Sequence, residues 1–197
     1  MAFVGLKYAV FAPIENEVRG QALTYGKGVV IGRAIGADIS FSRNSNPLYA
    51  DDARIEDDNS ITGGTVSINV DDVSDEAQTV ILGTSVNTED DTQVYSEDGD
   101  ASPYGGFGYI RVRRLKGVTS YVAYFIHKVM LGIATETANT KGESITWQTP
   151  TLSGSMMAVV NREDMKNYFR DHVTFETEAE AVAWLNKRAN ITDAAGV

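Results

Sequence analysis

The chain has 197 residues, with 27 acidic against 17 basic side chains and a net charge of −10. This balance argues against a nucleic-acid-binding module and against an anionic membrane surface as the partner, because Lys and Arg drive both kinds of contact. The sequence has no cysteine, which excludes a disulfide framework, a thiolate metal site and a thiol nucleophile.

The length and a hydrophobic fraction of 43% predict a soluble folded protein with one substantial core and room for an arm and a tail. The N-terminus lacks the basic region and apolar run of a signal peptide, and no segment is apolar over the length that a membrane span needs. We therefore expect synthesis and folding in a cytoplasm, without a membrane partner.

The N-terminal part of the chain predicts short strands. Residues 6–12 form the first, which we expect Pro13 to end; residues 29–31 are β-branched, and residues 37–41 alternate in polarity. Residues 15–28 are polar and interrupted by glycine, and they predict a loop.

An acidic segment, residues 44–60, follows these strands and predicts a projecting arm, either a long loop or a hairpin. Its carboxylates could bind a hard cation, but the segment lacks the glycine and the final glutamate of a calcium loop, so a solvated surface is the simpler interpretation. The residues that we expect to carry the contacts of this arm are Asn44, Pro47, Tyr49, Asp51, Asp52, Ile55, Glu56, Asp57 and Asp58.

A strand and a short helix come next. In residues 62–70, apolar and polar side chains alternate with the period of a half-buried strand. Ser74 then stands where a helix N-cap belongs, with acidic residues in the first turn, and Gly83 stands where a C-cap glycine belongs. Residues 89–103 are acidic and rich in turn formers, and they predict a solvated loop.

The longest strand-like run is residues 120–131. It follows a glycine-rich entry at residues 105–108, an alternating strand at residues 109–115 and a turn at Lys116 and Gly117. Both faces of the run are apolar, so either a helix of the same chain or a neighbouring subunit must cover the second face. If a subunit covers it, the contact residues are Tyr121, Ala123, Phe125, His127 and Val129, and His127 is a packed or interfacial residue.

The C-terminal part changes from strand to helix patterning. Residues 143–152 predict a strand that Pro150 places at an edge or a bulge, and residues 154–160 predict the last strand. The spacing of Met165, Tyr168 and Phe169 predicts a short helix over residues 161–169. Thr177 and Glu180 form the pattern of a capping box before a second helix, and residues 190–197 predict a frayed end. We therefore divide the chain into a β domain, residues 1–160, and a helical extension, residues 161–197.

No motif in the sequence predicts catalysis, a cofactor or a metal. The glycines of residues 26–32 lack the spacing and the strand-to-helix context of a dinucleotide fingerprint. His127 and His172 lack the spacing of a zinc motif, and no acidic pair stands beside the aromatic lining that a sugar-cleaving site needs. We therefore expect a protein that is not an enzyme.

Several stretches, in a consistent order, resemble the major tail protein, or tail tube protein, of long-tailed phages of Gram-positive bacteria. They are residues 5–10 (GLKYAV), 37–40 (ADIS), 44–52 (NSNPLYADD), 63–83, 104–108 (YGGFG), 141–151 (KGESITWQTPT) and 152–154 (LSG). The resemblance covers about residues 3–160, and the residues after 161 resemble the family least.

The resemblance implies a mainly β (α+β) fold, with a sandwich-like or barrel-like core and a flanking helix. It also implies hexameric rings of identical subunits that stack into a hollow tube and conduct DNA from capsid to host without catalysing a reaction. The implied location is the virion, and the implied partners are the protein itself and tape measure, tail terminator and baseplate proteins.

The residues suggest how such an assembly works. Exposed strand edges find partners in other copies, and a head-to-tail contact that closes by rotation makes a ring. We expect the arm to bridge one ring to the next, and we expect part of the surplus negative charge to face the channel, where it repels DNA weakly. Two alternatives remain: a carbohydrate- or receptor-binding β-module of a baseplate or decoration protein, and a hydrolase with two coupled carboxylates.

Overall fold

The computed structural model describes residues 2–89, 91–96, 102–135, 140 and 147–192. It is mainly β, with 60% strand and 11% helix. The strands are β1 (Ala2–Asn16), β2 (Thr24–Tyr25), β3 (Val29–Gly32), β4 (Ala34–Arg43), β5 (Asn46–Ala50), β6 (Ala53–Asp58), β7 (Ile61–Val70), β8 (Ser85–Glu89), β9 (Thr92–Ser96), β10 (Tyr104–Leu115), β11 (Val118–Thr135), β12 (Thr151–Met156) and β13 (Arg170–Phe175), and the helices are α1 (Asp75–Leu82) and α2 (Glu178–Arg188).

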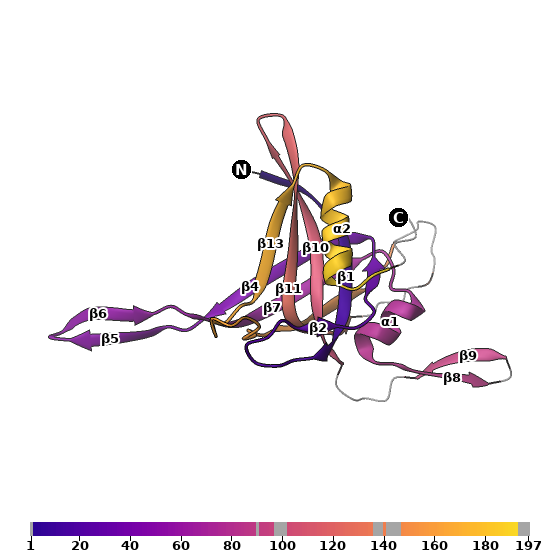
Figure 1. Ribbon diagram of the computed structural model, residues 1–197, viewed down its shortest axis with the longest axis horizontal. Coiled ribbons are helices and arrows are strands. Elements are labelled where there is room, and N and C mark those ends of the chain that lie inside the picture. Colours follow the sequence, from indigo (N-terminus) through magenta and orange to yellow (C-terminus); the bar gives the residue numbers. More distant parts are fainter. Residues whose placement is uncertain (1, 90, 97–101, 136–139, 141–146, 193–197) are drawn as a thin grey trace.

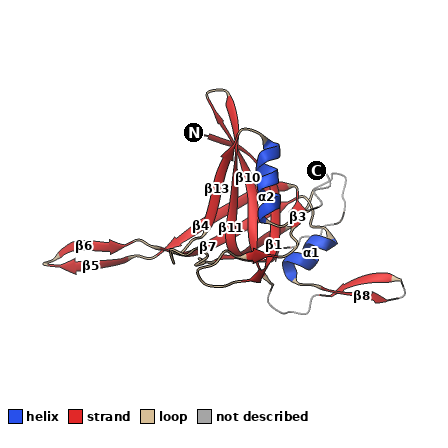
Figure 2. Ribbon diagram, in the orientation of Figure 1, coloured by secondary structure: helices blue, strands red, loops and turns tan. Residues whose placement is uncertain are grey.

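Nine of the described strands form one antiparallel sheet. Its order is β2-β1-β10-β11-β12-β7-β4, with β13 beside β11 and β3 beside β1. In Figure 1, β10, β11 and β13 run upright, while β4 and β7 cross them obliquely. Figure 2 shows two further hairpins, one of them containing β5 and β6, that extend from opposite sides of this body.

Apolar side chains gather on both faces of the sheet. The first cluster includes Phe107, Tyr124 and Ile126, and α1 contributes Ala77 and Ile81 to it. The second cluster lies on the opposite face of the sheet, where α2 packs on β1, β10 and β11. Its fully buried members are Val10, Ala12, Ile110, Ala123, Phe125, Ala181, Leu185 and Ala189.

The chain itself therefore covers the two-faced strand β11, and the inter-subunit role predicted for it is wrong. Ala123, Phe125, His127 and Val129 are buried within a single copy, and Tyr121 packs against the cluster beneath α2. Both edges of β11 are also paired, one with β10 and the other with β12 and β13. Of the two coverings that the sequence left open, the helix of the same chain is the correct one.

Val129 lies on the face opposite to the one predicted. Gly105 pairs with Val129, whereas Phe107 pairs with Ile126, so β11 contains one extra residue between these positions. Such a bulge reverses the alternation of side chains. Val129 consequently joins Ile126 in the first cluster instead of joining Phe125 in the second.

Several elements agree with their sequence signals. β7 buries Val66, Ile68 and Val70, as the alternation predicts. In α1, the Ser74 hydroxyl accepts a hydrogen bond from Ala77 N (3.3 Å), and Gly83 is left-handed at φ 75°. α2 begins at Thr177 with the predicted capping box and ends with Lys187 and Arg188 in its last turn.

The N-terminal strand continues beyond Pro13, contrary to the prediction. Pro13 pairs with Gly105, its carbonyl accepts a hydrogen bond from Gly26 N (2.9 Å), and β1 ends only at Asn16. The predicted loop of residues 15–28 therefore contains the end of β1 and the short strand β2. Backbone pairing with β2 extends the strand past a residue that usually ends one.

The predicted helix over residues 161–169 is also wrong. Val159 and Tyr168 exchange two backbone hydrogen bonds of 2.9 Å, and Met165 has a positive φ of 55°. β13, which the sequence did not predict, then pairs with β11. Because β13 and α2 complete the sheet and its second cluster, residues 161–192 belong to the β body and are not a helical extension.

The structure has one strand after Pro150 where the sequence predicted two strands around it. β12 starts at Thr151 and ends at Met156, so the two predicted strands, residues 143–152 and 154–160, overlap with one observed strand. Pro150 stands immediately before the ladder, where its carbonyl accepts a hydrogen bond from Val70 N (3.3 Å). Residues 143–146 of the prediction, and residues 193–197 of the predicted frayed end, lie outside the described residues.

The glycines predicted as a flexible entry lie inside β10 and allow close packing. A Cβ at Gly108 would lie 2.8 Å from Leu185 Cδ2 and 2.9 Å from Val10 Cγ2. Gly108 therefore lets α2 approach the sheet.

We expect Gly108→Ala to lower the free energy of unfolding by about 1–3 kcal/mol, because the added methyl group overpacks the contact with α2. Urea denaturation followed by circular dichroism measures this change. Gly132→Ala is the matched control, because nothing lies within 4 Å of its Cβ position, and it should change stability by less than about 1 kcal/mol. Equal effects of both variants would contradict the packing role.

Candidate assembly surface

Of the two forms predicted for the acidic segment, a long loop or a hairpin, the structure shows the hairpin. β5 and β6 pair with each other, and Asn44 N donates to Ser60 O (2.8 Å) at the base of this hairpin. Asp51 and Asp52 have φ values of 50° and 59°, which is the pattern of a two-residue type I′ turn. We call residues 44–60 the arm.

The arm exposes apolar side chains without support from the main sheet. Leu48, Tyr49 and Ile55 are exposed by 58%, 64% and 62%. The two-stranded sheet of the arm is separate from the nine-stranded sheet (Figure 1). An isolated two-stranded hairpin is marginally stable in water. The arm is therefore a surface that a partner would stabilise.

Most carboxylates of the arm face solvent. Arg54 forms an ion pair with Asp57 within β6. Asp58 accepts hydrogen bonds from Asn44 Nδ2 (2.8 Å) and Ser60 N (3.0 Å), and these bonds lower the pKa of Asp58. Asp51, Asp52 and Glu56 form no ion pair with a described residue and remain open to a cationic partner. Of the nine predicted arm residues, the structure thus assigns Asn44 and Asp58 to the base, Asp51 and Asp52 to the turn, and the rest to the two strands.

A second hairpin, β8 and β9, was missed by the sequence analysis. It projects from the side of α1 and exposes Val86 and Tyr95 by 44% and 37%. The acidic loop predicted at residues 89–103 overlaps with β9, and residues 90 and 97–101 lie outside the described part of the chain. The sequence of β8 (SVNTE) gives only a weak alternation of polar and apolar residues from which a strand could have been predicted. The alternation is weak because none of these side chains is buried.

An open cleft of about 530 Å³ lies where β1 and β4 approach each other. β4 ends the sheet and pairs only with β7 in the described structure, and the first half of β1 pairs only with β10. Both strands therefore present an unpaired edge. We call this space the β1–β4 cleft; its lining residues are Phe3, Gly5, Leu6, Gly36, Ala37, Asp38, Ile39, Phe41, Tyr109, Arg111 and Arg170.

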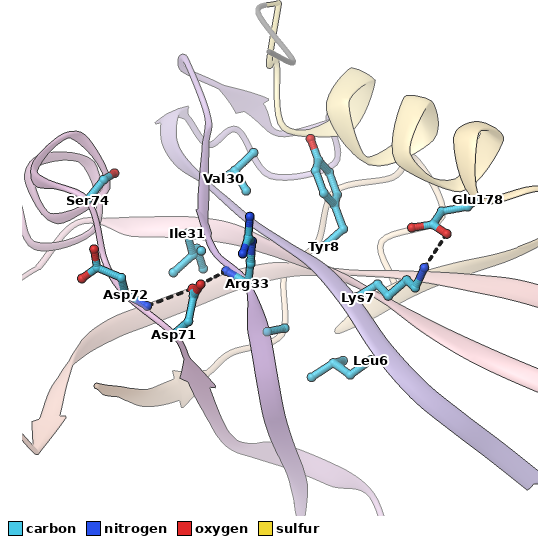
Figure 3. Close-up of a pocket in the computed structure, with 12 residues that line it drawn as sticks. Leu6, Lys7, Tyr8, Val30, Ile31, Arg33, Asp71, Asp72, Ser74 and Glu178 are labelled. Atoms are coloured by element: carbon cyan, nitrogen blue, oxygen red, sulfur yellow. Dashed lines mark hydrogen bonds and ion pairs between the residues drawn. The ribbon is translucent and has the colours of Figure 1, made fainter. Parts of the chain in front are cut away.

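A second cleft, of about 600 Å³, lies between β1, the turn from β3 to β4, and the ends of both helices (Figure 3). Two of its charged groups pair with each other, and one carboxylate is bonded by the backbone. Asp71 Oδ1 accepts from the backbone N–H groups of Arg33 (2.8 Å) and Asp72 (2.9 Å), and Lys7 pairs with Glu178 at 2.6 Å. These contacts fasten connections between elements.

His127 is a packed residue next to a charged cluster. Its imidazole is 1% exposed, and its Nε2 lies 3.4 Å from Asp171 Oδ1 without forming a hydrogen bond within the described structure. Arg162 and Arg188 contact the same carboxylate at 2.8 and 3.0 Å. The His127 imidazole and the two guanidinium groups lower the pKa of Asp171 from 3.8 to about 2. The two guanidinium contacts are shorter than the imidazole contact and have the length of charge-assisted hydrogen bonds.

Other kinds of site find little support in the described residues. They contain no group of three or more His, Asp or Glu side chains arranged to hold a metal ion, and no described helix has the length and apolarity to cross a membrane. Comparison with protein-family models and with curated proteins found no match for the chain.

Asp171→Asn tests the cluster that fastens β13 to α2. Because the pKa of Asp171 is lower in the folded state, its stabilising contribution is present above about pH 4 and disappears as pH falls to about 2. We expect the variant to lose about 1–2 kcal/mol of unfolding free energy at pH 7, with the difference from wild type vanishing at acid pH. Denaturant titrations at several pH values measure it, with Glu163→Gln as an exposed control. A loss that does not change with pH would contradict the ionic role.

Proposed function

We propose that this protein is a structural subunit of a phage tail tube, which assembles into hexameric rings that stack into a hollow DNA-conducting tube. The observation that supports the proposal most is the arm: a projecting hairpin with exposed apolar side chains and unpaired carboxylates, whose two strands share no ladder with the main sheet. Apolar side chains exposed on a projecting element are typical of a surface that meets another protein.

The unpaired edges of β4 and β1 support the self-assembly part of the proposal. Unpaired strand edges recruit further strands, and native monomers usually cover or blunt them. A contact between the edge of one copy and a different surface of the next is heterologous, and it closes into a ring when the rotation allows. These two edges replace β11 as candidate ring contacts, because β11 is paired on both sides.

The proposed conduction of DNA relies on the sign of the charge. A channel wall rich in Lys and Arg would hold duplex DNA through counterion release, whereas an acidic or neutral wall has no trapping contacts. The net charge of −10 supplies carboxylates for such a wall. In this proposal the tape measure, tail terminator and baseplate proteins are further partners, the protein resides in the virion, and it catalyses no reaction.

Negative-stain electron microscopy of the concentrated protein tests the proposed function. We expect rings with sixfold symmetry and stacks of rings. A protein that stays monomeric at every concentration would contradict the proposal, and binding of glycans by that monomer would favour a carbohydrate-binding module instead.

Removing the arm should separate folding from assembly. We expect deletion of residues 47–58, with a short turn joining the base, to retain the far-ultraviolet circular dichroism of the body and to abolish stacking, because the arm shares no ladder with the main sheet. A milder variant, Leu48→Ser with Tyr49→Ser and Ile55→Ser, should have the same effect on stacking. The control is Met165→Ser, which alters an apolar side chain with 55% exposure outside the arm. Unfolding of the deletion variant would show that the arm belongs to the core.

A further inference from the structure

Charge is distributed unevenly between the arm and the β10–β11 hairpin. The arm carries five carboxylates and one guanidinium, for a net charge of −4. Residues 104–135, which include β10 and β11, contain five Lys and Arg residues and no Asp or Glu. In a chain with a net charge of −10, this is a distinctly basic region. Most of its positive charge lies near the turn between the two strands, at Arg111, Arg113, Arg114 and Lys116.

The β1–β4 cleft opens beside this basic region. The Arg111 guanidinium lies 3.6 Å from the centre of the Phe3 ring, and Arg170 lies 4.8 Å from the centre of the Phe41 ring. Neither guanidinium forms an ion pair with a described residue, although Asp38 also lines the cleft. The cleft therefore offers two half-buried cations on an apolar wall, together with the unpaired edge of β4.

We propose that the β1–β4 cleft of one copy receives the acidic arm of a second copy. The arm's carboxylates, above all Glu56, face Arg111 and Arg170, while its apolar side chains contact the wall formed by Phe3 and Leu6. This inference rests on the proposed function, and it assigns the surface on which the arm docks. The match is one of charge and polarity: an anionic, partly apolar hairpin against a cationic, partly apolar cleft.

The occupant is a second copy because the arm cannot fold back on its own cleft. β4 passes from the cleft at Phe41 directly into the arm, and the arm then extends away from the body (Figure 1). At about 3.3 Å per residue, the strands of the arm reach roughly 20 Å beyond the sheet. A DNA phosphate backbone would also meet the two arginines, but it would not match the apolar wall or pair with a strand edge.

Cross-linking between two single-cysteine chains tests the docking. One chain carries Ala50→Cys near the tip of the arm, and the other carries Gly36→Cys in the cleft together with a mass tag. Nothing lies within 4 Å of the Cβ position of Gly36, and the natural chain has no cysteine. The matched control is Gly132→Cys, whose Cβ position is equally open but lies outside the cleft.

We expect the Gly36→Cys chain to give at least about tenfold more heterodimer with a short bis-maleimide than the Gly132→Cys chain. Adding Arg111→Glu to the cleft chain should reduce this yield to the control level, whereas Arg19→Glu, which makes the same charge change at an exposed site outside the cleft, should not. Glu56→Lys in the arm chain should reduce it as well, and it keeps the test valid if Arg111→Glu impairs folding. Combining Glu56→Lys with Arg111→Glu should restore the cross-link.

The outcomes separate this inference from the proposed function. Tubes in micrographs of the wild-type protein without a selective cross-link would overturn the docking and leave the tube function standing. A selective cross-link without rings or tubes would support the docking and contradict the tube. Absence of both would overturn both. Loss of the cross-link on adding a short DNA duplex that binds the wild-type chain would identify the cleft as a phosphate site and overturn the inference.

Discussion

The unpaired outer edge of β4 is the constraint on which the rest of the molecule depends. A strand in the middle of an antiparallel sheet satisfies its backbone N–H and C=O groups on both sides, whereas β4 pairs with β7 alone among the described strands. Water can satisfy the free groups in a single copy, but a long uncovered edge also invites another strand. Among the residues that the structure describes, no helix packs on this edge and no ladder joins it to β1, since the two strands share a cleft instead. In a protein that works alone this arrangement would be a liability. In the proposed assembly, the unpaired edge of β4 is the surface that contacts another copy.

The body can leave this edge open because its core is complete elsewhere. α2 covers one face of β11 with Ala181 and Leu185, and the first cluster, with α1, covers the other. The Asp171 cluster then joins β13 to α2 through Arg188 and to the preceding loop through Arg162. Residues after 161, which the sequence set apart, thus complete the main sheet and its second cluster. The two hairpins form sheets of their own and contribute no strand to this body.

The sequence predicted the elements whose signals are local. The caps of α1 and α2 depend on neighbouring residues such as Ser74, Gly83 and Thr177, and those predictions are confirmed. Elements decided by distant contacts were missed: β13 forms because β11 offers it an edge, and the bridge between Val159 and Tyr168 overrides the helical spacing of Met165 and Tyr168. One bulged residue in β11 was enough to move Val129 to the other face. The acidic arm was predicted as a projecting element, but its docking surface could not be, since β1, β4 and β10 meet only in the folded chain.

Electrostatics restricts how copies of this chain can meet. A symmetric contact that paired arm with arm would place two net charges of −4 against each other, and like charges facing each other oppose association. An arm that meets the basic side of a different copy avoids this repulsion, and such a heterologous contact leaves a free cleft on the first copy and a free arm on the second. Growth can then continue from both ends of a stack. Salt screens surface charge over about 10 Å at 0.1 M, so Leu48, Tyr49 and Ile55 must supply the part of the contact that salt does not weaken. The same hairpin therefore has to carry both carboxylates and exposed apolar side chains, which is the combination observed in the arm.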